Sequence, residues 1–587
     1  MSSKRILNLV LVAFLFWPCT QVSGQGVSQE KSSLMGAIAG QVINESGQPV
    51  VNVLVTLRSL GGSKTVRTTT TDAQGKFEIK GLAPEAYQVW AWQPSFFIAT
   101  PEDSGSTLYR VGDQVTLRLI KGGVITGTVV SQTGEPVVAV PVRAYRIDDS
   151  GQRFRNLSGS FIRTTDDRGV YRIYGLPPGT YIVGAGGSDT SGPEYWVNPF
   201  ANDAPTFAPS ASRDTAGEVA VRSGEEVSGI DIRYQGDPGS SISGTATSAA
   251  PVVSGFSIEL TRDFQGRSQP TAQSFQQPGS RGFLFSGLAD GDYYLTARLL
   301  KPEGVEWLIS DRRLVKVRGA DIDGIELPVK SLGSLSGQIQ LKETTAPECK
   351  DSIRPSFAET IVTGRRSQRI PNEDQSTVLS LTQLIVPDEH GGFILRNLTP
   401  GQYSFRIRTF AKYWYLDSMF LEAASGKVKK GEPERRPVDA VKNLTSVKSG
   451  SRISGLTITL AGGAGVIEGK IAPGKNEKTL PRKTFVYLVP AEADRVEDVL
   501  RYFVEGVSPD GSFTLSSLPP GRYWALAKTV PENEVPNVEA LRLSSSAQLR
   551  KELRQQAEAG QADAILKPCQ TLTLELPSAS PKFTGVP

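Results

Sequence analysis

The chain has very little histidine and cysteine, two residue types on which many enzymes and metal centres depend. Its 587 residues include one histidine, His390, and three cysteines. A zinc site, a Ser-His-Asp triad or a Cys-His pair each needs a suitably placed histidine. His390 stands in the stretch DEHGGF, which is typical of a turn. We therefore expect His390 to be a turn residue, and we assign no catalytic residue, no metal and no cofactor.

Other catalytic signatures are also missing. The sequence contains no Gly-rich phosphate loop, no nucleophile elbow and no cysteines at metal-ligand spacing. Composition alone does not exclude a glycosidase that uses a pair of carboxylates, because Asp and Glu occur throughout. Since no segment is left over for a catalytic domain, we expect the protein not to be an enzyme.

The chain has no excess of either charge. Without residues 1–24 it carries 62 basic and 60 acidic side chains, a net charge of +2. This balance gives no electrostatic reason to expect nucleic acid or an anionic membrane as a partner. The basic stretch KVKKGEPERR at 427–436 mixes charges with Gly and Pro, so it is predicted to be a solvated loop.

Long apolar runs are absent after the N-terminus, so we expect no transmembrane span in the mature chain. Residues 1–24 have a basic start, an apolar stretch of about a dozen residues and a small-residue end, as secretory signal peptides do. An uncleaved anchor is the alternative; a lipid on Cys19 is disfavoured by the bulky Trp17 and Pro18. The predicted location is secreted, periplasmic or at the cell surface.

A thirteen-residue pattern is present five times. Its frame is Gly, x, Phe/Tyr, x, Ile/Leu/Phe, x, x, Leu, two turn residues, Gly, x, Tyr. The copies are GKFEIKGLAPEAY (75–87), GVYRIYGLPPGTY (169–181), RGFLFSGLADGDY (281–293), GGFILRNLTPGQY (391–403) and GSFTLSSLPPGRY (511–523). The final tyrosines lie between 94 and 120 residues apart. That period suits a whole small domain better than a solenoid repeat.

Strand patterns frame each copy. An Ile/Leu-x-Gly-x-apolar segment precedes it, as in IAGQV (38–42), and a period-two segment follows, as in VTLRL (115–119). The predicted parts are a linker (25–35), five β-sandwiches (36–120, 121–235, 236–329, 330–461 and 462–577) and a C-terminal tail (578–587). The links between sandwiches are short, which limits bending.

The repeat itself is predicted to be a strand, a corner and a second strand. In YSFRIRT (403–409), Tyr403, Phe405 and Ile407 share one face, as in a half-buried strand. The final Tyr can bury its ring and direct its hydroxyl at a backbone group, as corner tyrosines do. The fold class is therefore all-β, with five tandem Ig-like or transthyretin-like antiparallel sandwiches of about seven strands each.

One helix is expected near the C-terminus, over 545–560. There Leu549, Leu553 and Ala557 form a narrow apolar stripe and Gly560 can cap the end. We expect this helix to dock on the fifth sandwich. A helix that binds a partner is the alternative.

Two cysteines remain after residue 24, Cys349 and Cys569. An exported protein permits a disulfide, so these two form a candidate pair. They fall in different sandwiches and disulfide geometry is strict. Two separate buried thiols are the alternative.

The pattern GxV…GxPV…DxxGxFxIxxLxPGxY resembles the carboxypeptidase regulatory-like domain. The residues that carry it are Gly40, Gly47, Pro49, Asp72, Gly75, Phe77, Leu82 and Tyr87 in the first copy, and Gly127, Gly134, Pro136, Asp166, Gly169, Tyr171, Leu176, Gly179 and Tyr181 in the second. The resemblance implies a transthyretin-like sandwich akin to carbohydrate-binding-like folds, common in bacterial secreted and outer-membrane proteins. It implies no peptidase activity, because the zinc ligands are missing.

The repeated aspartates Asp72, Asp166 and Asp388 could be read as calcium ligands. One carboxylate next to a Gly falls far short of the six to eight oxygens that calcium takes. We expect these side chains to form turns by accepting hydrogen bonds from nearby backbone.

Three aromatic-rich segments are candidates for binding: 89–97, 194–207 and 412–420. Flat rings next to amide groups suit sugars or proline-rich peptides. For Trp90 and Trp92, packing against a neighbouring sandwich is favoured over ligand binding. Tyr195, Trp196, Phe200 and Phe207 are the candidate ligand-binding residues, because their segment looks most like a surface loop.

The sequence thus predicts a non-catalytic secreted or cell-envelope protein that acts as a scaffold, in adhesion or as an interaction module. The first alternative is an array of carbohydrate-binding modules, and a weaker one is an accessory part of an outer-membrane transport or secretion system. Expected partners are a polysaccharide or cell-envelope proteins.

Overall fold

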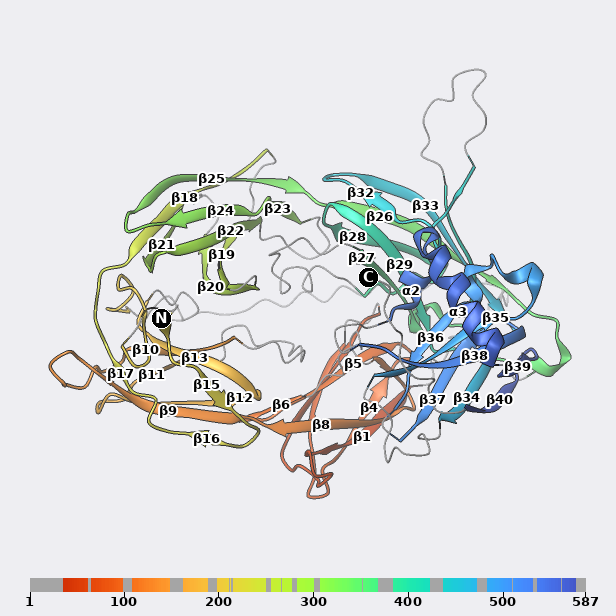
Figure 1. Ribbon diagram of the computed structural model, residues 1–587, viewed down its shortest axis with the longest axis horizontal. Helices are drawn as coiled ribbons and strands as arrows, with labels where there is room; N and C mark the ends of the chain where they lie inside the picture. The colour runs from red at the N-terminus through yellow and green to blue at the C-terminus, as the bar shows by residue number, and fades with distance from the viewer. Residues whose placement is uncertain are drawn as a thin grey trace, which may run out of the picture. The chain divides into compact units, whose positions relative to one another are not determined.

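The computed structural model contains five successive β-sandwiches, each with two layers of strands, which in the third sandwich belong to one continuous eight-stranded sheet (Figure 1). It describes residues 35–587 except 62–64, 99–107, 148–161, 188–197, 211, 213–214, 250–254, 265–266, 277–281, 300–306, 351, 368–383, 423–435, 472–482, 509, 532–535, 561 and 577–587. The predicted signal peptide and C-terminal tail therefore lie outside the described residues. Among the described residues, no helix is long and apolar enough to cross a membrane.

The first sheet of each sandwich contains the opening strand, the first strand of the repeat and the closing strand. In the first module these strands are β1 (Gly36–Ile43), β4 (Lys76–Leu82), β6 (Phe96–Ile98) and β8 (Gln114–Lys121), and in the second they are β9 (Gly123–Val130), β12 (Val170–Leu176), β16 (Glu226–Val227) and β17 (Ile232–Arg233). The third module has β18 (Ser240–Ser248), β21 (Gly282–Leu288) and β25 (Ile322–Ser331), and the fourth has β26 (Gly333–Lys342), β28 (Gly392–Leu398), β30 (Trp414–Leu421), β31 (Val438–Asp439) and β33 (Arg452–Gly462). The fifth module has β34 (Gly465–Ile471), β37 (Ser512–Leu518) and β40 (Thr571–Leu576).

The opening and closing strands of every module are hydrogen-bonded neighbours that run parallel. The sheets are thus mixed, whereas the sequence led us to expect purely antiparallel ones. Each opening strand contains the glycine of the Ile/Leu-x-Gly-x pattern, and a side chain on this glycine would collide with the closing segment of the module. A Cβ added to this glycine would lie 2.0 to 2.2 Å from a carbonyl oxygen of the closing strand or of a residue just before that strand. The five glycines are Gly40, Gly127, Gly244, Gly337 and Gly469. This close approach explains the glycine in the Ile/Leu-x-Gly-x pattern.

The second sheet is centred on the second strand of the repeat. Its strands are β2 (Leu54–Ser59), β3 (Val66–Thr70), β5 (Ala86–Trp92) and β7 (Leu108–Arg110); β10 (Pro141–Arg146), β11 (Ile162–Thr164), β13 (Gly179–Ala185), β14 (Thr206–Phe207) and β15 (Val219–Val221); β19 (Phe256–Phe264), β20 (Arg267–Gln276), β22 (Gly291–Leu299) and β24 (Arg313–Val317); β27 (Thr360–Arg366), β29 (Gly401–Thr409) and β32 (Thr445–Val447); and β35 (Thr484–Pro490), β36 (Phe503–Gly506), β38 (Gly521–Thr529) and β39 (Asp563–Leu566). In the third module β23 (Leu308–Ser310) pairs with both β22 and β25 and joins the two sheets.

Each module has its own apolar core between its two sheets. Alternation along the strands supplies it: in β5, Tyr87, Val89 and Ala91 point inward, while the residues between them are more exposed. Burying a side chain the size of Val or Leu contributes about 1.5–3 kcal/mol. Fourteen buried residues form the first core, so each sandwich has a hydrophobic centre of its own.

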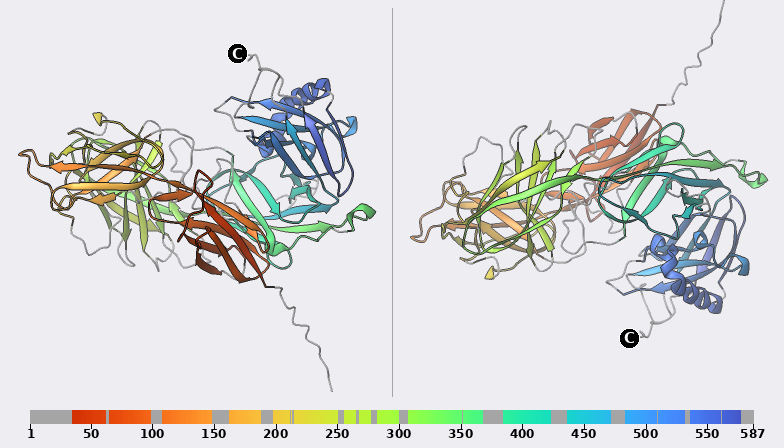
Figure 2. Two further views of the ribbon diagram at one scale, coloured as in Figure 1. Left: turned by 90° about the horizontal axis from the view of Figure 1, so that it is seen from below. Right: turned by 90° about the horizontal axis from the view of Figure 1, so that it is seen from above.

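Within the part of the chain that the structure describes, helices are few and short. The 3₁₀-helices are η2 (Pro347–Cys349), η3 (Phe357–Glu359), η4 (Ala493–Arg495), η5 (Val499–Arg501) and η6 (Ser544–Ser546), and the α-helices are α2 (Val538–Arg542) and α3 (Ala547–Gly560). Asn537 caps α2 by accepting hydrogen bonds from the backbone of Glu539 and Ala540. Both α-helices lie on the fifth module (Figures 1 and 2).

Helix α3 was predicted to dock on the fifth sandwich, and it does, against the outer face of the second sheet. The predicted apolar stripe was wrong in one position. Leu553 and Ala557 are buried, but Leu549 is 45% exposed. Arg550 is buried in its place, where its Nη1 donates to the carbonyl oxygens of Leu541 and Leu543.

Candidate functional site

The most regular polar feature of the molecule is the corner formed by the repeat. In all five modules the ring of the final tyrosine is buried, and its hydroxyl donates to the backbone carbonyl four residues earlier. The bonds measure 2.6 to 2.9 Å for Tyr87, Tyr181, Tyr293, Tyr403 and Tyr523. This arrangement confirms the predicted tyrosine corner. Each hydroxyl is used to hold the turn closed.

Burial changes the acidity of these phenols. Loss of solvation raises the pKa of Tyr87 to about 12, with a further contribution from the nearby Glu85 carboxylate. Loss of solvation also raises the pKa of Tyr403 and Tyr523. A phenol held in its neutral form at physiological pH donates a hydrogen bond but is a poor general base, which needs a pKa near the working pH.

The aspartates that precede the repeat form turns, as predicted. One carboxylate oxygen of each accepts two backbone N–H groups, two and four residues further on, at 2.8 to 3.0 Å: Asp72, Asp166 and Asp388. His390 lies in the third of these turns with an exposed side chain beside Glu389. Within the described residues, no group of three or more His, Cys, Asp and Glu side chains could hold a metal ion.

The corner also contains a backbone feature that we did not predict from the sequence. The residue before the repeat leucine has a positive φ of 56° to 79° in all five copies: Gly81, Gly175, Gly287, Asn397 and Ser517. In all five modules the pairing with the opening strand shifts register at this point, which marks a β-bulge. Glycine in three of the copies was the available signal, and it was obscured by Asn397 and Ser517.

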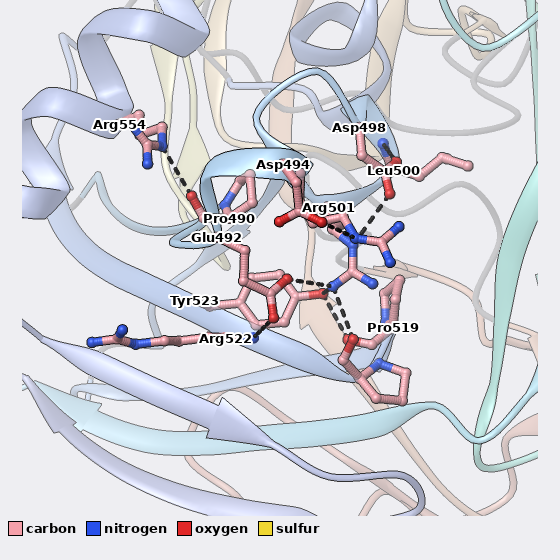
Figure 3. A network of polar contacts seen from close by, with 12 residues as sticks. Pro490, Glu492, Asp494, Asp498, Leu500, Arg501, Pro519, Arg522, Tyr523 and Arg554 are labelled. Atoms are coloured by element: carbon pink, nitrogen blue, oxygen red, sulfur yellow. Dashed lines mark hydrogen bonds and ion pairs between the residues drawn. The ribbon is translucent and has the colours of Figure 1, made fainter.

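A polar network surrounds the corner of the fifth module (Figure 3). Arg501 Nη1 donates to the Pro520 carbonyl at 2.9 Å and to the Tyr523 hydroxyl at 3.3 Å, and its Nε donates to Asp498 at 3.2 Å. Glu492 accepts from the backbone N–H of Arg522 at 3.2 Å. Each of these groups holds backbone or neutralises a neighbour, so the network fixes the corner.

One pocket can be described among the residues that the structure places. A pocket of about 570 Å³ lies at the turn that contains Asp388; its lining includes Ile385, Val386, Pro387 and Phe393. Asp388 is a carboxylate of this lining, and both of its backbone contacts belong to the turn. We assign no ligand to this pocket.

Of the four predicted ligand-binding residues, two can be located. Tyr195 and Trp196 lie outside the described residues. Phe207 is 2% exposed in strand β14, opposite Gly184, and its ring lies 5.7 Å from that of Tyr145. Its burial leaves no face free for a ligand, because the missing side chain of Gly184 makes room for the ring.

Phe200 is partly buried against the core of the second module. Its ring meets the ring of Tyr234 edge to face at 5.7 Å. Phe200 and Phe207 therefore both pack within their module. The prediction for Tyr195 and Trp196 stays a prediction.

Trp90 and Trp92 differ from the sequence-based expectation in the opposite direction. We expected both indoles to pack against a neighbouring sandwich. Instead, Trp90 is 38% and Trp92 59% exposed, on the outer face of strand β5. Their large exposed surface is unusual for tryptophan.

The fourth and fifth modules are covalently linked. Cys349 of η2 and Cys569 form a disulfide between residues 220 positions apart. Noncovalent contacts also join these two modules. The backbone N–H of Ser544 donates to the Lys442 carbonyl at 2.9 Å, and Arg406 forms an ion pair with Glu539. These contacts join α2 and η6 to the fourth module.

Residues 37–110 match the family model of the carboxypeptidase regulatory-like domain. Among solved structures, the TIE protein of Bacillus anthracis is 13% identical with a TM-score of 0.13, covering 50% of this chain and 51% of that one. This chain thus spans about half the length of that protein. The minor pilin GBS52 of Streptococcus agalactiae is 15% identical with a TM-score of 0.19, covering 34% and 96%.

Two B repeats of the collagen-binding protein of Staphylococcus aureus are 12% identical with a TM-score of 0.12, covering 73% of this chain and 99% of that one. These scores are too low to carry an argument about function. No curated protein matches the chain. The family match coincides with the first module, in which the glycines, the Asp72 turn and the Tyr87 corner all occupy the places described above. The similarity to the carboxypeptidase regulatory-like domain thus falls on the first module.

Proposed function

We propose that this chain is a non-catalytic, exported scaffold whose five separately folded sandwiches serve adhesion or interaction at the cell envelope. The boundaries we propose are those given by the repeat: 36–120, 121–235, 236–329, 330–461 and 462–577. The polar groups of the corners support this function, because they are engaged in holding turns and strands.

The observation that carries the proposal is the recurrence of one contact at all four links. A backbone N–H at each link donates to a carbonyl of the preceding module: Gly122 to Ser95 (2.7 Å), Gly239 to Asn202 (2.8 Å), Leu332 to Trp307 (3.3 Å) and Ala464 to Tyr413 (2.8 Å). A flexible tether between independent binding modules would need no such contact. The recurrence suits a spacer that supports and presents its modules.

A second contact reinforces the third link. The backbone N–H of Trp307 donates to the side-chain oxygen of Asn397 at 2.8 Å. Asn397 is the bulge residue of the fourth module, with a φ of 56°. The strained residue thus fastens two modules together, which explains why asparagine is present where three other copies have glycine.

The proposal is tested with the full chain. We expect protease treatment of intact cells to digest it, because it is exported, and we expect the purified protein to cosediment with cell-envelope preparations. We expect no hydrolysis of peptide or glycan substrates. Retention in the cytosol, failure to cosediment or measurable hydrolysis would each contradict the proposal. A role in an outer-membrane transport system stays a prediction without support among the described residues.

A further inference from the structure

The outer face of the second sheet in the first module is covered at its β7 end, where Ala86 and Leu108 pack against Ile361 of the fourth module. The rest of this face, on β3, β2 and the second half of β5, carries an ordered set of partly or fully exposed side chains. Strand register places them in three rows across β3, β2 and β5: Thr70, Leu54 and Trp92; Thr68, Thr56 and Trp90; Val66, Arg58 and Gln88. Leu54 and Val66 are exposed, as are both tryptophans. We call these nine residues the tryptophan face. It contains one positive charge and no carboxylate.

The corresponding faces of the other modules are covered from within the chain. In the second module Phe207 lies over Gly184. In the third, the Arg312 guanidinium stacks on the Tyr294 ring at 3.7 Å, and Arg298 approaches Trp307 at 5.2 Å.

The fourth and fifth modules use charged groups and a helix for the same purpose. Arg406 of the fourth pairs with Glu539 of α2. In the fifth, α3 packs on the sheet and Arg554 stacks on Trp524 at 4.9 Å. Among the described residues, Trp90 and Trp92 have no hydrogen bond and no guanidinium contact. The first module thus presents two exposed tryptophan rings on the part of this face that the fourth module does not cover.

The size of the tryptophan face limits what can bind it. Three strands about 4.8 Å apart and three rows about 6.8 Å apart give a footprint on the order of 300 Å². A stable protein–protein interface needs about 800 Å² on each partner. A chain-like ligand fits this face better than a globular protein.

The chemistry of the face selects the class of ligand. The face of an indole ring carries partial negative charge, which attracts the weakly positive C–H groups on the flat side of a pyranose ring. Each threonine hydroxyl both donates and accepts a hydrogen bond, and Arg58 adds donors. Trp90 and Trp92 lie about 6.8 Å apart along the strand, so they can contact neighbouring rings of one chain.

We propose that the tryptophan face binds an uncharged polysaccharide chain by stacking pyranose rings on Trp92 and Trp90, with Thr56, Thr68 and Thr70 binding hydroxyl groups. This inference deepens the proposed function and rests on it, because it names the ligand class through which an envelope scaffold would adhere. It moves the glycan-binding site from the second module, where the sequence suggested it, to the first.

The test measures retardation of the full chain in native gels that contain dextran, amylopectin, mixed-linkage β-glucan, xylan or galactomannan, followed by calorimetry with the best ligand. We expect at least one of these polysaccharides to bind. Trp92→Ala should weaken binding about tenfold, and Trp90→Ala with Trp92→Ala should abolish it. The matched control is Phe420→Ala, which removes a 43% exposed aromatic ring from the fourth module and should leave binding unchanged.

Several results would overturn the inference. One is that no polysaccharide of the panel retards the wild-type chain, and another is that Trp92→Ala binds as the wild type does. Self-association that disappears in the double variant would mean that a second copy occupies the face. Thermal unfolding of each variant separates loss of binding from loss of fold. Continued envelope cosedimentation without glycan binding would refute this inference and leave the proposed function standing.

Discussion

The second sheets of the first and fifth modules share a strand order but differ in what covers them. Counted from the corner tyrosine, Trp90 corresponds to Leu526 and Trp92 to Lys528. Leu526 packs beneath α3, whereas Trp90 and Trp92 face solvent. The fifth module therefore supplies its own cover for the apolar residues of this face. In the first module the apolar surface remains available to a partner, which is how an exposed patch gains a function.

The largest effect should come from removing the cover of the fifth module. Leu553→Ala creates a cavity between α3 and the sheet, since Leu553 is 1% exposed, and should cost about 2–5 kcal/mol. Leu549→Ala, on the exposed side of the same helix, is the control and should cost less than about 0.5 kcal/mol. Hydrogen exchange should rise in β35 and β38 and stay unchanged in β2 and β5. Equal effects of the two substitutions would contradict this packing.

The disulfide gives a second difference between the two ends of the molecule. Replacing Cys349 and Cys569 together by serine should lower the stability of the fourth and fifth modules by about 2–4 kcal/mol. The first module, which has no cysteine, should unfold as before. Calorimetry of the wild type in reducing agent should reproduce the profile of the double variant. A shift of all transitions together would show that the modules do not unfold separately.

The tyrosine corners of the first and fifth modules should differ by a smaller amount in how much they contribute to stability. Tyr87→Phe and Tyr523→Phe each remove a hydrogen bond to the carbonyl four residues earlier, at about 1 kcal/mol. The loss should be greater for Tyr523, because its hydroxyl also accepts from Arg501. Urea unfolding followed by hydrogen exchange in β5 and β38 measures both. Equal losses would mean that Arg501 contributes nothing to the corner.

Alkaline pH tests the same residues. The folded state raises the pKa of Tyr87 from 10.0 to about 12, so its contribution to stability is full below pH 10. That contribution falls as the pH rises through 12, because the unfolded chain loses the proton first. Tyr87→Phe should therefore lose less stability than the wild type between pH 10 and 12. A steeper loss in the variant would reverse the sign of the linkage.

The smallest effect on stability should come from a substitution on the tryptophan face. Trp92→Ala should change stability by no more than about 0.5 kcal/mol, since the indole is 59% exposed and has no polar partner among the described residues. The midpoint of thermal unfolding measures this. A loss as large as that of Leu553→Ala would mean that Trp92 is a packing residue after all.

Local patterns in the sequence predicted local structure well. The tyrosine corner and the Asp72 turn depend on contacts within four residues, so they follow from spacing alone. The same holds for the five sandwiches, because strand alternation and turn residues recur in each copy. Helix α3 was found from its periodicity for the same reason.

Contacts between distant residues were not predictable in this way. The burial of Phe207 depends on Gly184 in a neighbouring strand, and that of Arg550 on the carbonyls that end α2. The exposure of Trp92 depends on the absence of a covering element, which no spacing within β5 reveals. The parallel pairing of opening and closing strands likewise joins residues about 75 positions apart, such as Gly40 and Val115.

That parallel pairing has a mechanical consequence. The chain enters each module on one strand, β1 for example, and leaves on its direct neighbour, β8. Tension on the two ends would pull these strands in opposite directions along their length, so their hydrogen bonds would be loaded together in shear. A protein anchored at one end and held at the other would resist stretching at every module in the same way.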